Sequence, residues 1–200
     1  MEVILLRHGQ TAGNLARRYI GRTDEPLCEA GITAICKAGP FPAVPHVYVS
    51  PMLRAKQTAA LLFPNAEQMV ADGLREMDFG DFEGRSANEM VHDTAYRTWV
   101  DGGCASACPG GEDIEAYSTR ICAAFDEIIR KAIARAEKRV TVVAHGGSIM
   151  AIMGRCAKPR HDFYHWHVQN GCGYRAYLDE AAWADHPVFT HYEALEASDL

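Results

Sequence analysis

The chain has 200 residues, of which 48% are hydrophobic, and a formal net charge of -6 at pH 7. This length and apolar content are typical of one domain with a substantial core. The acidic balance excludes general nucleic-acid binding, which needs a broad basic face to neutralise phosphates. An anion bound by this protein must therefore meet a few cations concentrated at one place.

The apolar segments are too short or too interrupted for a signal peptide or a membrane span. Residues 3–6 are a brief apolar run, and the longer run 140–153 is broken by His145, Gly146 and Gly147. We therefore expect a soluble, cytoplasmic protein with no membrane partner.

The cysteines indicate reduced thiols. There are seven, with no Cys-x-x-Cys pair, in a chain that begins without a leader pattern. Cys104 and Cys108 lie four apart in the loop DGGCASACPGG. Because no second half-site accompanies them, we expect neither zinc nor a local disulfide there.

Apolar, β-branched segments alternate with helical patterns along the chain. Strands are predicted at residues 2–8, 46–51 and 140–145, with further strands at 173–180 and 188–195. Helices are predicted at residues 29–38, 51–62 and 112–138, with Pro51 at a first helical position. This order predicts an α/β fold, a three-layer α/β/α sandwich with a mostly parallel central sheet.

One segment fits this alternation poorly. Residues 80–111 are rich in glycine and contain one helical pattern, at 86–100. With no linker or repeat in the chain, we expect a single domain over residues 1–200 and a substrate-specificity insertion at about 80–111. Its aromatic residues Phe82, Tyr96 and Trp99 are of the type found more often in a core than against a ligand.

The predicted strands end on basic side chains. Arg7 and His8 end the first strand, Arg54 follows the second by about one helical turn, and His145 ends the third. Open α/β sheets bind ligands at the carboxyl ends of their strands. Each residue alone could merely end a strand or meet solvent, but together they predict a site for a small, highly charged anion.

The motifs that carry these residues resemble a known family. RHGQT, SPMLRAKQTA, EMDFGDFEG and AHGG, in this order, are similar to the motifs of the histidine phosphatase superfamily, which includes cofactor-dependent phosphoglycerate mutases and many phosphomonoesterases. The resemblance implies that His8 is a nucleophile that takes the phosphoryl group. It also implies that Arg7, Arg54 and His145 surround the phosphoryl oxygens, with guanidinium and imidazolium supplying the positive charge and no metal or cofactor required.

The resemblance also implies a general acid. Glu76, in LREMDFG, would protonate the leaving oxygen and later deprotonate the attacking water. Glu76 must be protonated for the first step, which burial or a nearby phosphate dianion would favour. Asp78 and Glu83 lie close in sequence and are the rival candidates.

Three further residues are candidates for phosphate binding. Asn14 could add a neutral donor, although it could equally cap the following helical turn. The backbone around Gly21 and Gly146 can approach an anion closely, because neither residue carries a Cβ.

The stretch HDFYHWHVQNG raises a metal hypothesis. His161, His165 and His167 have spacings that could serve zinc, and in a strand His165 and His167 would share one side. No cysteine or carboxylate motif accompanies them, so we expect no metal, and a substrate-facing or structural role instead.

Within the family, the sequence favours a phosphatase over a mutase. The chain is short, and RHGQTAGN lacks the tryptophan that usually precedes the asparagine in the mutases. GRTDEPLCEAG, CPGGED and HWHVQNGCGYR look like α-ribazole phosphatases of cobalamin biosynthesis, with departures at Cys28 and Phe82. The expected substrate is a small phosphorylated metabolite, α-ribazole 5′-phosphate. The alternatives are a broad-specificity sugar-phosphate or nucleotide phosphatase, a phosphoglycerate mutase and a catalytically silent phosphate-binding module.

Overall fold

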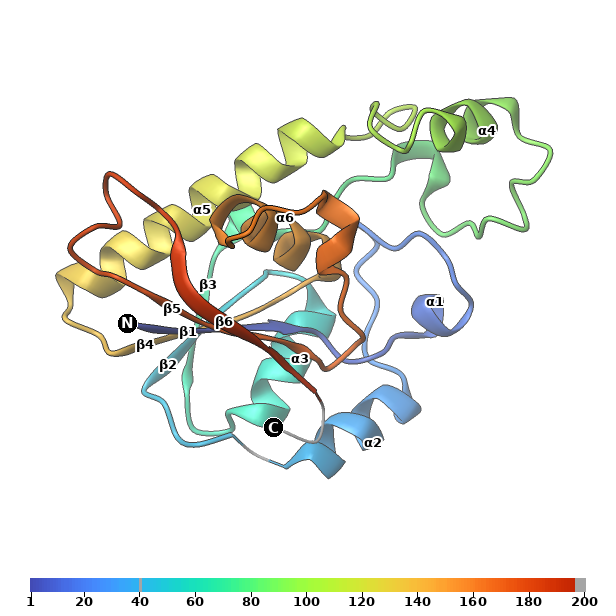
Figure 1. The fold of residues 1–200 in the computed structure, drawn as a ribbon. Helices are drawn as coiled ribbons and strands as arrows, with labels where there is room; N and C mark the ends of the chain where they lie inside the picture. Colours follow the sequence, from blue (N-terminus) through green and yellow to red (C-terminus); the bar gives the residue numbers. More distant parts are fainter. Residues whose placement is uncertain (40, 197–200) are drawn as a thin grey trace.

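The computed structural model describes residues 1–39 and 41–196. Its centre is a six-stranded sheet with the strand order β3-β2-β4-β1-β5-β6 (Figure 1). The strands are β1 (Glu2–Arg7), β2 (His46–Val49), β3 (Glu67–Val70), β4 (Arg139–Ala144), β5 (Gly173–Leu178) and β6 (Phe189–Leu195).

Most of the sheet is parallel, as predicted. β1, β2, β3 and β4 run in one direction, β5 is antiparallel to β1, and β6 is antiparallel to β5. The five predicted strands are present. β3 was not predicted, because its four residues are all exposed or half-buried and show no apolar run.

Helices cover both faces of the sheet and confirm the three-layer sandwich. The helices are α1 (Ala12–Leu15), α2 (Glu29–Ala38), α3 (Leu53–Leu62), α4 (Thr94–Asp101), α5 (Ile114–Ala134) and α6 (Gly146–Cys156). α5 and α6 share one core cluster with Val3, Leu5 and Val142, whereas α2 and α3 share the other with Ile4, Leu6 and Val143 (Figure 1). Alternate residues of β1 therefore supply the two cores, as the period of a strand dictates.

Three helices begin later than predicted, among them α5, which begins at Ile114 and not at residue 112. Pro51 is not the first helical residue of α3, because Met52 is the N-cap and the N–H of Leu53 donates to Asp24 Oδ1 at 2.6 Å. The helical pattern at 86–100 gives only α4, preceded by turns. Asp93 starts α4 by accepting from the N–H groups of Ala95 and Tyr96.

The segment 80–111 carries α4 and extends beyond the N-terminal end of α5, away from the sheet (Figure 1). An aromatic cluster fastens it to the loop after α1. Tyr19 packs edge to face on Tyr96 and Trp99, and the hydroxyls of Tyr19 and Tyr96 lie 3.0 Å apart. Phe82, Tyr96 and Trp99 are buried, with exposures of 1%, 8% and 5%, and Trp99 also lines a pocket.

Among the described residues, no helix is long and apolar enough to cross a membrane.

Candidate active site

The sheet register brings the predicted strand-end residues together. Arg7 of β1 lies opposite Ala144 of β4, and Val49 of β2 lies opposite Val143. The residues that follow, His8, Ser50 and His145, therefore emerge at one edge of the sheet. The rings of His8 and His145 meet edge to face with their centroids 5.2 Å apart.

His8 is held by one ring nitrogen and open at the other. Nδ1 lies 2.6 Å from the carbonyl oxygen of Gly9, so this nitrogen carries the proton and donates it. Within the described part of the chain, Nε2 has no hydrogen bond, and it is not among the buried unpartnered atoms. Burial, with the charges of Arg54 and Arg7, holds the pKa of His8 well below its usual value. The imidazole is therefore neutral with a free lone pair.

Arg54 is fully buried at the N-terminus of α3. Its terminal nitrogens donate to the carbonyls of Thr23 and Gly21, both at 2.8 Å, while Nε is buried with no partner among the described residues. Thr58 fastens this helix to the His8 loop, accepting from the N–H of Gly9 and donating to the Arg54 carbonyl. The guanidinium is thus oriented before any ligand arrives.

Arg7 is arranged in the same way. Its Nη1 donates to the carbonyl of Val168 at 2.7 Å, and its Nε is buried without a partner in residues 1–39 and 41–196. Burial lowers the pKa of Arg7, and the carboxylate of Glu76 opposes this shift. A Cβ on Gly146 would meet this guanidinium at 3.4 Å, so the glycine leaves room for Arg7 against the start of α6.

His145 ends β4 and is the N-cap of α6. Its Nε2 lies 2.7 Å from Ser50 Oγ, which also accepts from the N–H of Met52. If Ser50 donates its hydroxyl proton to Nε2, the ring proton lies on Nδ1, which is buried and unpartnered in the described structure. Burial and Arg54 hold the pKa of His145 well below its usual value, so this ring is a neutral donor and not the imidazolium expected from the sequence.

Glu76 is the only one of the three candidate acids that lines the pocket. Its Oε1 accepts from the hydroxyl of Tyr117 at 2.5 Å and from the N–H of Met77 at 3.0 Å. Asp78 instead pairs with Arg22, at 3.1 Å, and accepts from the N–H of Gly80.

Glu83 is a structural anchor for the loop that contains Gly21. Its carboxylate accepts from the backbone N–H groups of residues 21, 22, 23 and 79. The expectation that the Gly21 backbone meets the phosphate is wrong in this structure, because its N–H is taken by Glu83 and its carbonyl by Arg54. Gly21 is required for another reason: a Cβ there would lie 1.8 Å from the Met77 carbonyl oxygen.

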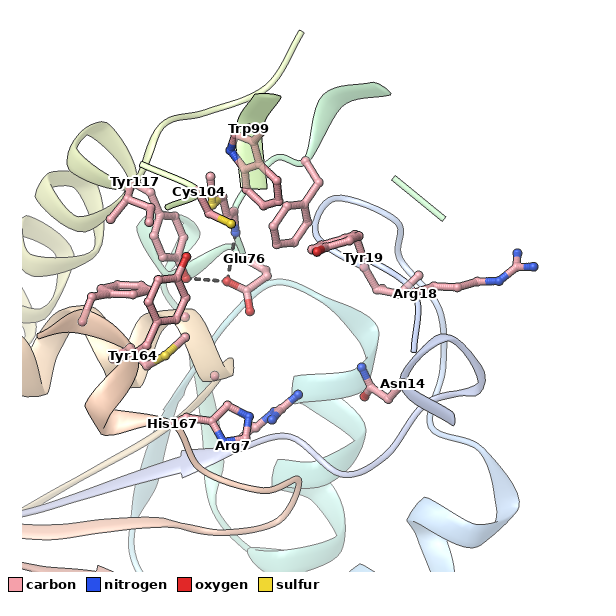
Figure 2. Close-up of a pocket in the computed structure, with 18 residues that line it drawn as sticks. Arg7, Asn14, Arg18, Tyr19, Glu76, Trp99, Cys104, Tyr117, Tyr164 and His167 are labelled. Atoms are coloured by element: carbon pink, nitrogen blue, oxygen red, sulfur yellow. Dashed lines mark hydrogen bonds between the residues drawn. The ribbon is translucent and has the colours of Figure 1, made fainter. Parts of the chain in front are cut away.

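Asn14 has its expected capping role and also lines the pocket. Its side chain completes the capping box of α1 with Thr11, and its Oδ1 also accepts from Asn170 at 3.1 Å. With the oxygen engaged twice, the amide nitrogen is the group that faces the pocket (Figure 2). Asn14 can therefore donate to an anion on the pocket floor.

Some of these groups line a cavity of about 380 Å³ (Figure 2), whereas the buried His8, Arg54 and His145 are not among its lining residues. Arg7, Asn14, Glu76 and Gly146 contribute to its polar floor, while its walls are mainly aromatic and apolar. The wall residues include Tyr19, Phe79, Trp99, Cys104, Ile114, Met150, Phe163 and Tyr164. Trp99 and Cys104 belong to the segment 80–111, so this segment does reach the pocket.

The histidine-rich stretch does not form a strand. Residues Phe163–Trp166 form a 3₁₀ turn, which contains His165 and ends just before His167. The ring of His161 stacks on that of His165, with the centroids 3.9 Å apart. His167 lines the pocket. No group of three or more histidine, cysteine or acidic residues in the described chain is placed to hold a metal ion. Cys104 and Cys108 are both free thiols.

Sequence reasoning missed three site residues. They are Tyr117, Ser50 and Gly147, the second glycine of AHGG. A Cβ on Gly147 would lie 2.6 Å from Glu76 Oε1 and 2.7 Å from the Tyr117 hydroxyl. The second glycine of that motif was the available signal for a close approach there.

Several known proteins are similar to this chain in sequence and in fold. The chain is 28% identical to the adenosylcobalamin/alpha-ribazole phosphatase of Salmonella typhimurium over 86% of this chain and 88% of the relative. It is 30% identical to a 2,3-bisphosphoglycerate-dependent phosphoglycerate mutase of Azorhizobium caulinodans, over 76% and 79% of the two chains. The solved alpha-ribazole phosphatase of Shigella flexneri matches with a TM-score of 0.76 at 25% identity, over 90% of this chain and 91% of that one.

A putative alpha-ribazole-5′-P phosphatase of Escherichia coli has the same fold, with a TM-score of 0.82 at 23% identity over 100% of this chain and 98% of that one. Residues 3–186 match the histidine phosphatase superfamily (branch 1), with the catalytic motifs inside the matched range. The protein folded around these two histidines and two arginines belongs to the histidine phosphatase superfamily, branch 1.

Proposed function

We propose that the protein is a phosphomonoesterase that works through a phosphohistidine on His8. The carrying observation is a set of three buried donor atoms without partners, Arg7 Nε, Arg54 Nε and His145 Nδ1. Buried donors are rarely left unpaired. These three belong to the residues grouped around the open Nε2 of His8, where the oxygens of a phosphoryl group would satisfy them.

The first half of the reaction forms a bond between Nε2 of His8 and phosphorus and breaks the bond from phosphorus to the leaving oxygen. Glu76 gives its proton to that oxygen, so that an alcohol leaves. The arginines and His145 donate to the three other oxygens, where negative charge is spread in the transition state. The neutral state of His8 supports this step, because only an unprotonated ring nitrogen can attack.

The second half returns the enzyme. Glu76, now ionised, takes a proton from water as the water oxygen attacks phosphorus. The bond between phosphorus and Nε2 breaks, phosphate leaves, and His8 regains a neutral imidazole. Each half uses groups of this chain alone, so the proposed reaction requires no metal or cofactor.

The walls of the pocket support a leaving alcohol that carries an aromatic base and, with it, α-ribazole 5′-phosphate as substrate. Tyr19, Trp99 and Tyr164 line the same pocket as Arg7 and offer ring surfaces on which such a base could pack. Arg18 also lines the pocket, but it is paired with Glu89 at 2.9 Å, which disfavours recognition of a second acidic group such as the carboxylate of phosphoglycerate.

The test is phosphate release from a panel of α-ribazole 5′-phosphate, 3-phosphoglycerate, sugar phosphates and nucleotides, with His8→Ala as the control. We expect α-ribazole 5′-phosphate to have the highest kcat/KM and His8→Ala to lose about a thousandfold or more. Wild-type enzyme quenched in alkali, in which phosphohistidine is stable, should carry a phosphate that His8→Ala lacks. No release from any member, or dependence on a bisphosphate primer, would overturn the phosphatase assignment.

The substrate assignment has its own variant. Tyr164 is 52% exposed and lines the pocket, so Tyr164→Ala should fold normally. We expect it to raise KM for α-ribazole 5′-phosphate several-fold and to leave KM for glycerol phosphate unchanged. Equal effects on both, or a flat panel in the wild type, would favour a generalist phosphatase.

A further inference from the structure

We propose that Tyr117 is a positioning residue for the general acid: it fixes the Glu76 proton on the oxygen that faces the leaving group. The inference rests on the proposed function of Glu76. It assigns the task to a hydroxyl on α5, a helix that contributes none of the motif residues.

The two oxygens of Glu76 have different surroundings. Oε1 accepts two hydrogen bonds, from the Tyr117 hydroxyl at 2.5 Å and from the Met77 N–H at 3.0 Å. Two donors occupy both lone pairs of a carboxyl oxygen, so Oε1 has no place for a proton of its own. Oε2 points into the pocket on the side of Arg7 (Figure 2). A proton on Glu76 is therefore directed to Oε2.

Tyr117 is itself held as a donor. Its hydroxyl lies 3.2 Å from Ser148 Oγ, and the tyrosine is fully buried. Burial, with the nearby charge of Glu76, raises the pKa of Tyr117 well above its usual value, so the hydroxyl keeps its proton. Since that proton goes to Glu76, Ser148 donates to the tyrosine oxygen. The chain of donors therefore runs from α6 through α5 to the acid.

The same helix also holds the backbone that leads into Glu76. Arg120, one turn along α5 from Tyr117, donates to the carbonyls of Gly73 and Arg75, both at 3.0 Å. It is held in place by Glu112, which its Nη2 meets at 2.7 Å. Arg120 therefore holds the backbone near Glu76, and the hydroxyl of Tyr117 orients the carboxyl group.

The test is Tyr117→Phe, which keeps the buried ring and removes only the hydroxyl. We expect kcat/KM to fall at least about tenfold for an alkyl phosphate such as α-ribazole 5′-phosphate, since general acid catalysis contributes roughly 10²–10⁴-fold. For p-nitrophenyl phosphate, whose phenolate needs little protonation, the fall should be under about threefold. A merely structural role would lower both rates equally.

A double-mutant cycle makes the assignment specific. In a Glu76→Gln background, Tyr117→Phe should have no further effect on the alkyl phosphate, because the group it orients is gone. Tyr96→Phe is the matched control: it removes another inward-facing hydroxyl, bonded to Tyr19 and not to Glu76, and should leave the ratio of the two substrates unchanged. Ser148→Ala should shift that ratio in the same direction as Tyr117→Phe, by less.

The outcomes separate the two proposals. A wild-type enzyme without phosphatase activity would end the proposed function, and this inference with it. An active wild type in which Tyr117→Phe affects both substrates equally, affects neither, or adds to Glu76→Gln in full would overturn the role of Tyr117 alone. If Tyr117→Phe loses its cooperative thermal unfolding, Ser148→Ala decides the question by the same substrate ratio.

Discussion

His8 and His145 meet edge to face with their ring centroids 5.2 Å apart, in a site that also holds the guanidinium groups of Arg7 and Arg54. Each histidine is buried, and burial and the charges of both arginines disfavour its protonated form. The pKa of each histidine is therefore held well below its usual value. The positive charge of the site therefore resides in the arginines. The two rings remain neutral, as the proposed reaction requires of His8 as nucleophile and of His145 as hydrogen-bond donor.

The first prediction concerns stability against pH. Because the folded-state pKa of each histidine lies below its unfolded value near 6.5, the unfolded chain binds more protons in the interval between the two values. Their contribution to stability is complete above about pH 6.5 and is lost as the pH falls toward the folded pKa. Each contributes a slope of up to about 1.4 kcal/mol per pH unit.

Urea unfolding of the wild type between pH 7.5 and 5 measures this slope. His8→Asn, which removes one titrating group, should have a shallower slope than the wild type. Identical slopes would mean that His8 takes up its proton as readily in the folded chain as in the unfolded one.

The second prediction concerns the identity of the general acid. Glu76→Gln keeps the shape of the side chain and removes the proton, so alkyl phosphates should slow by roughly 10²-fold or more while p-nitrophenyl phosphate slows far less. Asp78→Asn and Glu83→Gln are the controls. Asp78 pairs with Arg22, and Glu83 accepts several backbone N–H groups, so these changes should not distinguish the two substrates. A larger substrate-dependent loss in either control would move the acid to that residue.

The parallel strands explain why so much of the site was readable from the sequence. A buried strand is a local pattern, and the ends of parallel strands meet at one edge, so Arg7, His8, Arg54 and His145 could be grouped before any coordinates. Glu76 was chosen as the candidate general acid by its position in a motif, and the structure places its side chain at the pocket.

The errors come from contacts that no local pattern encodes. A glycine such as Gly21 is typical of a loop that binds phosphate, yet its N–H donates to the carboxylate of Glu83, 62 residues away in sequence. Tyr117 lies on the apolar stripe of α5, where a buried tyrosine reads as core, and only the tertiary fold brings its hydroxyl to Glu76.

The third prediction concerns metal. His161 stacks on His165, whereas His167 lines the pocket. The proposed reaction draws its positive charge from Arg7 and Arg54, so activity should be unchanged after dialysis against excess EDTA. Atomic emission analysis of the dialysed enzyme checks that the metal content is below stoichiometric. This expectation would be contradicted if dialysis removed the activity of the wild type and zinc restored it, and if the His161→Ala, His165→Ala double variant did not show this loss and recovery.

The last prediction concerns the space that Gly147 leaves for the acid. A Cβ at this position would lie 2.6 Å from Glu76 Oε1 and 2.7 Å from the Tyr117 hydroxyl, so Gly147→Ala must push these two groups apart or away from α6. We expect Gly147→Ala to lower kcat/KM for alkyl phosphates at least about tenfold, because the acid is displaced, with a smaller loss for p-nitrophenyl phosphate.

Gly154→Ala, on the same helix, is the matched control, because the nearest atom to its Cβ would be Trp166 Cδ1 at 3.9 Å. This change should leave both rates intact and raise the free energy of unfolding by about 0.5–1 kcal/mol, since alanine is the better helix former. Equal kinetics for the two alanine variants would show that the acid tolerates a methyl group at position 147, and that its placement does not depend on the second glycine of the motif.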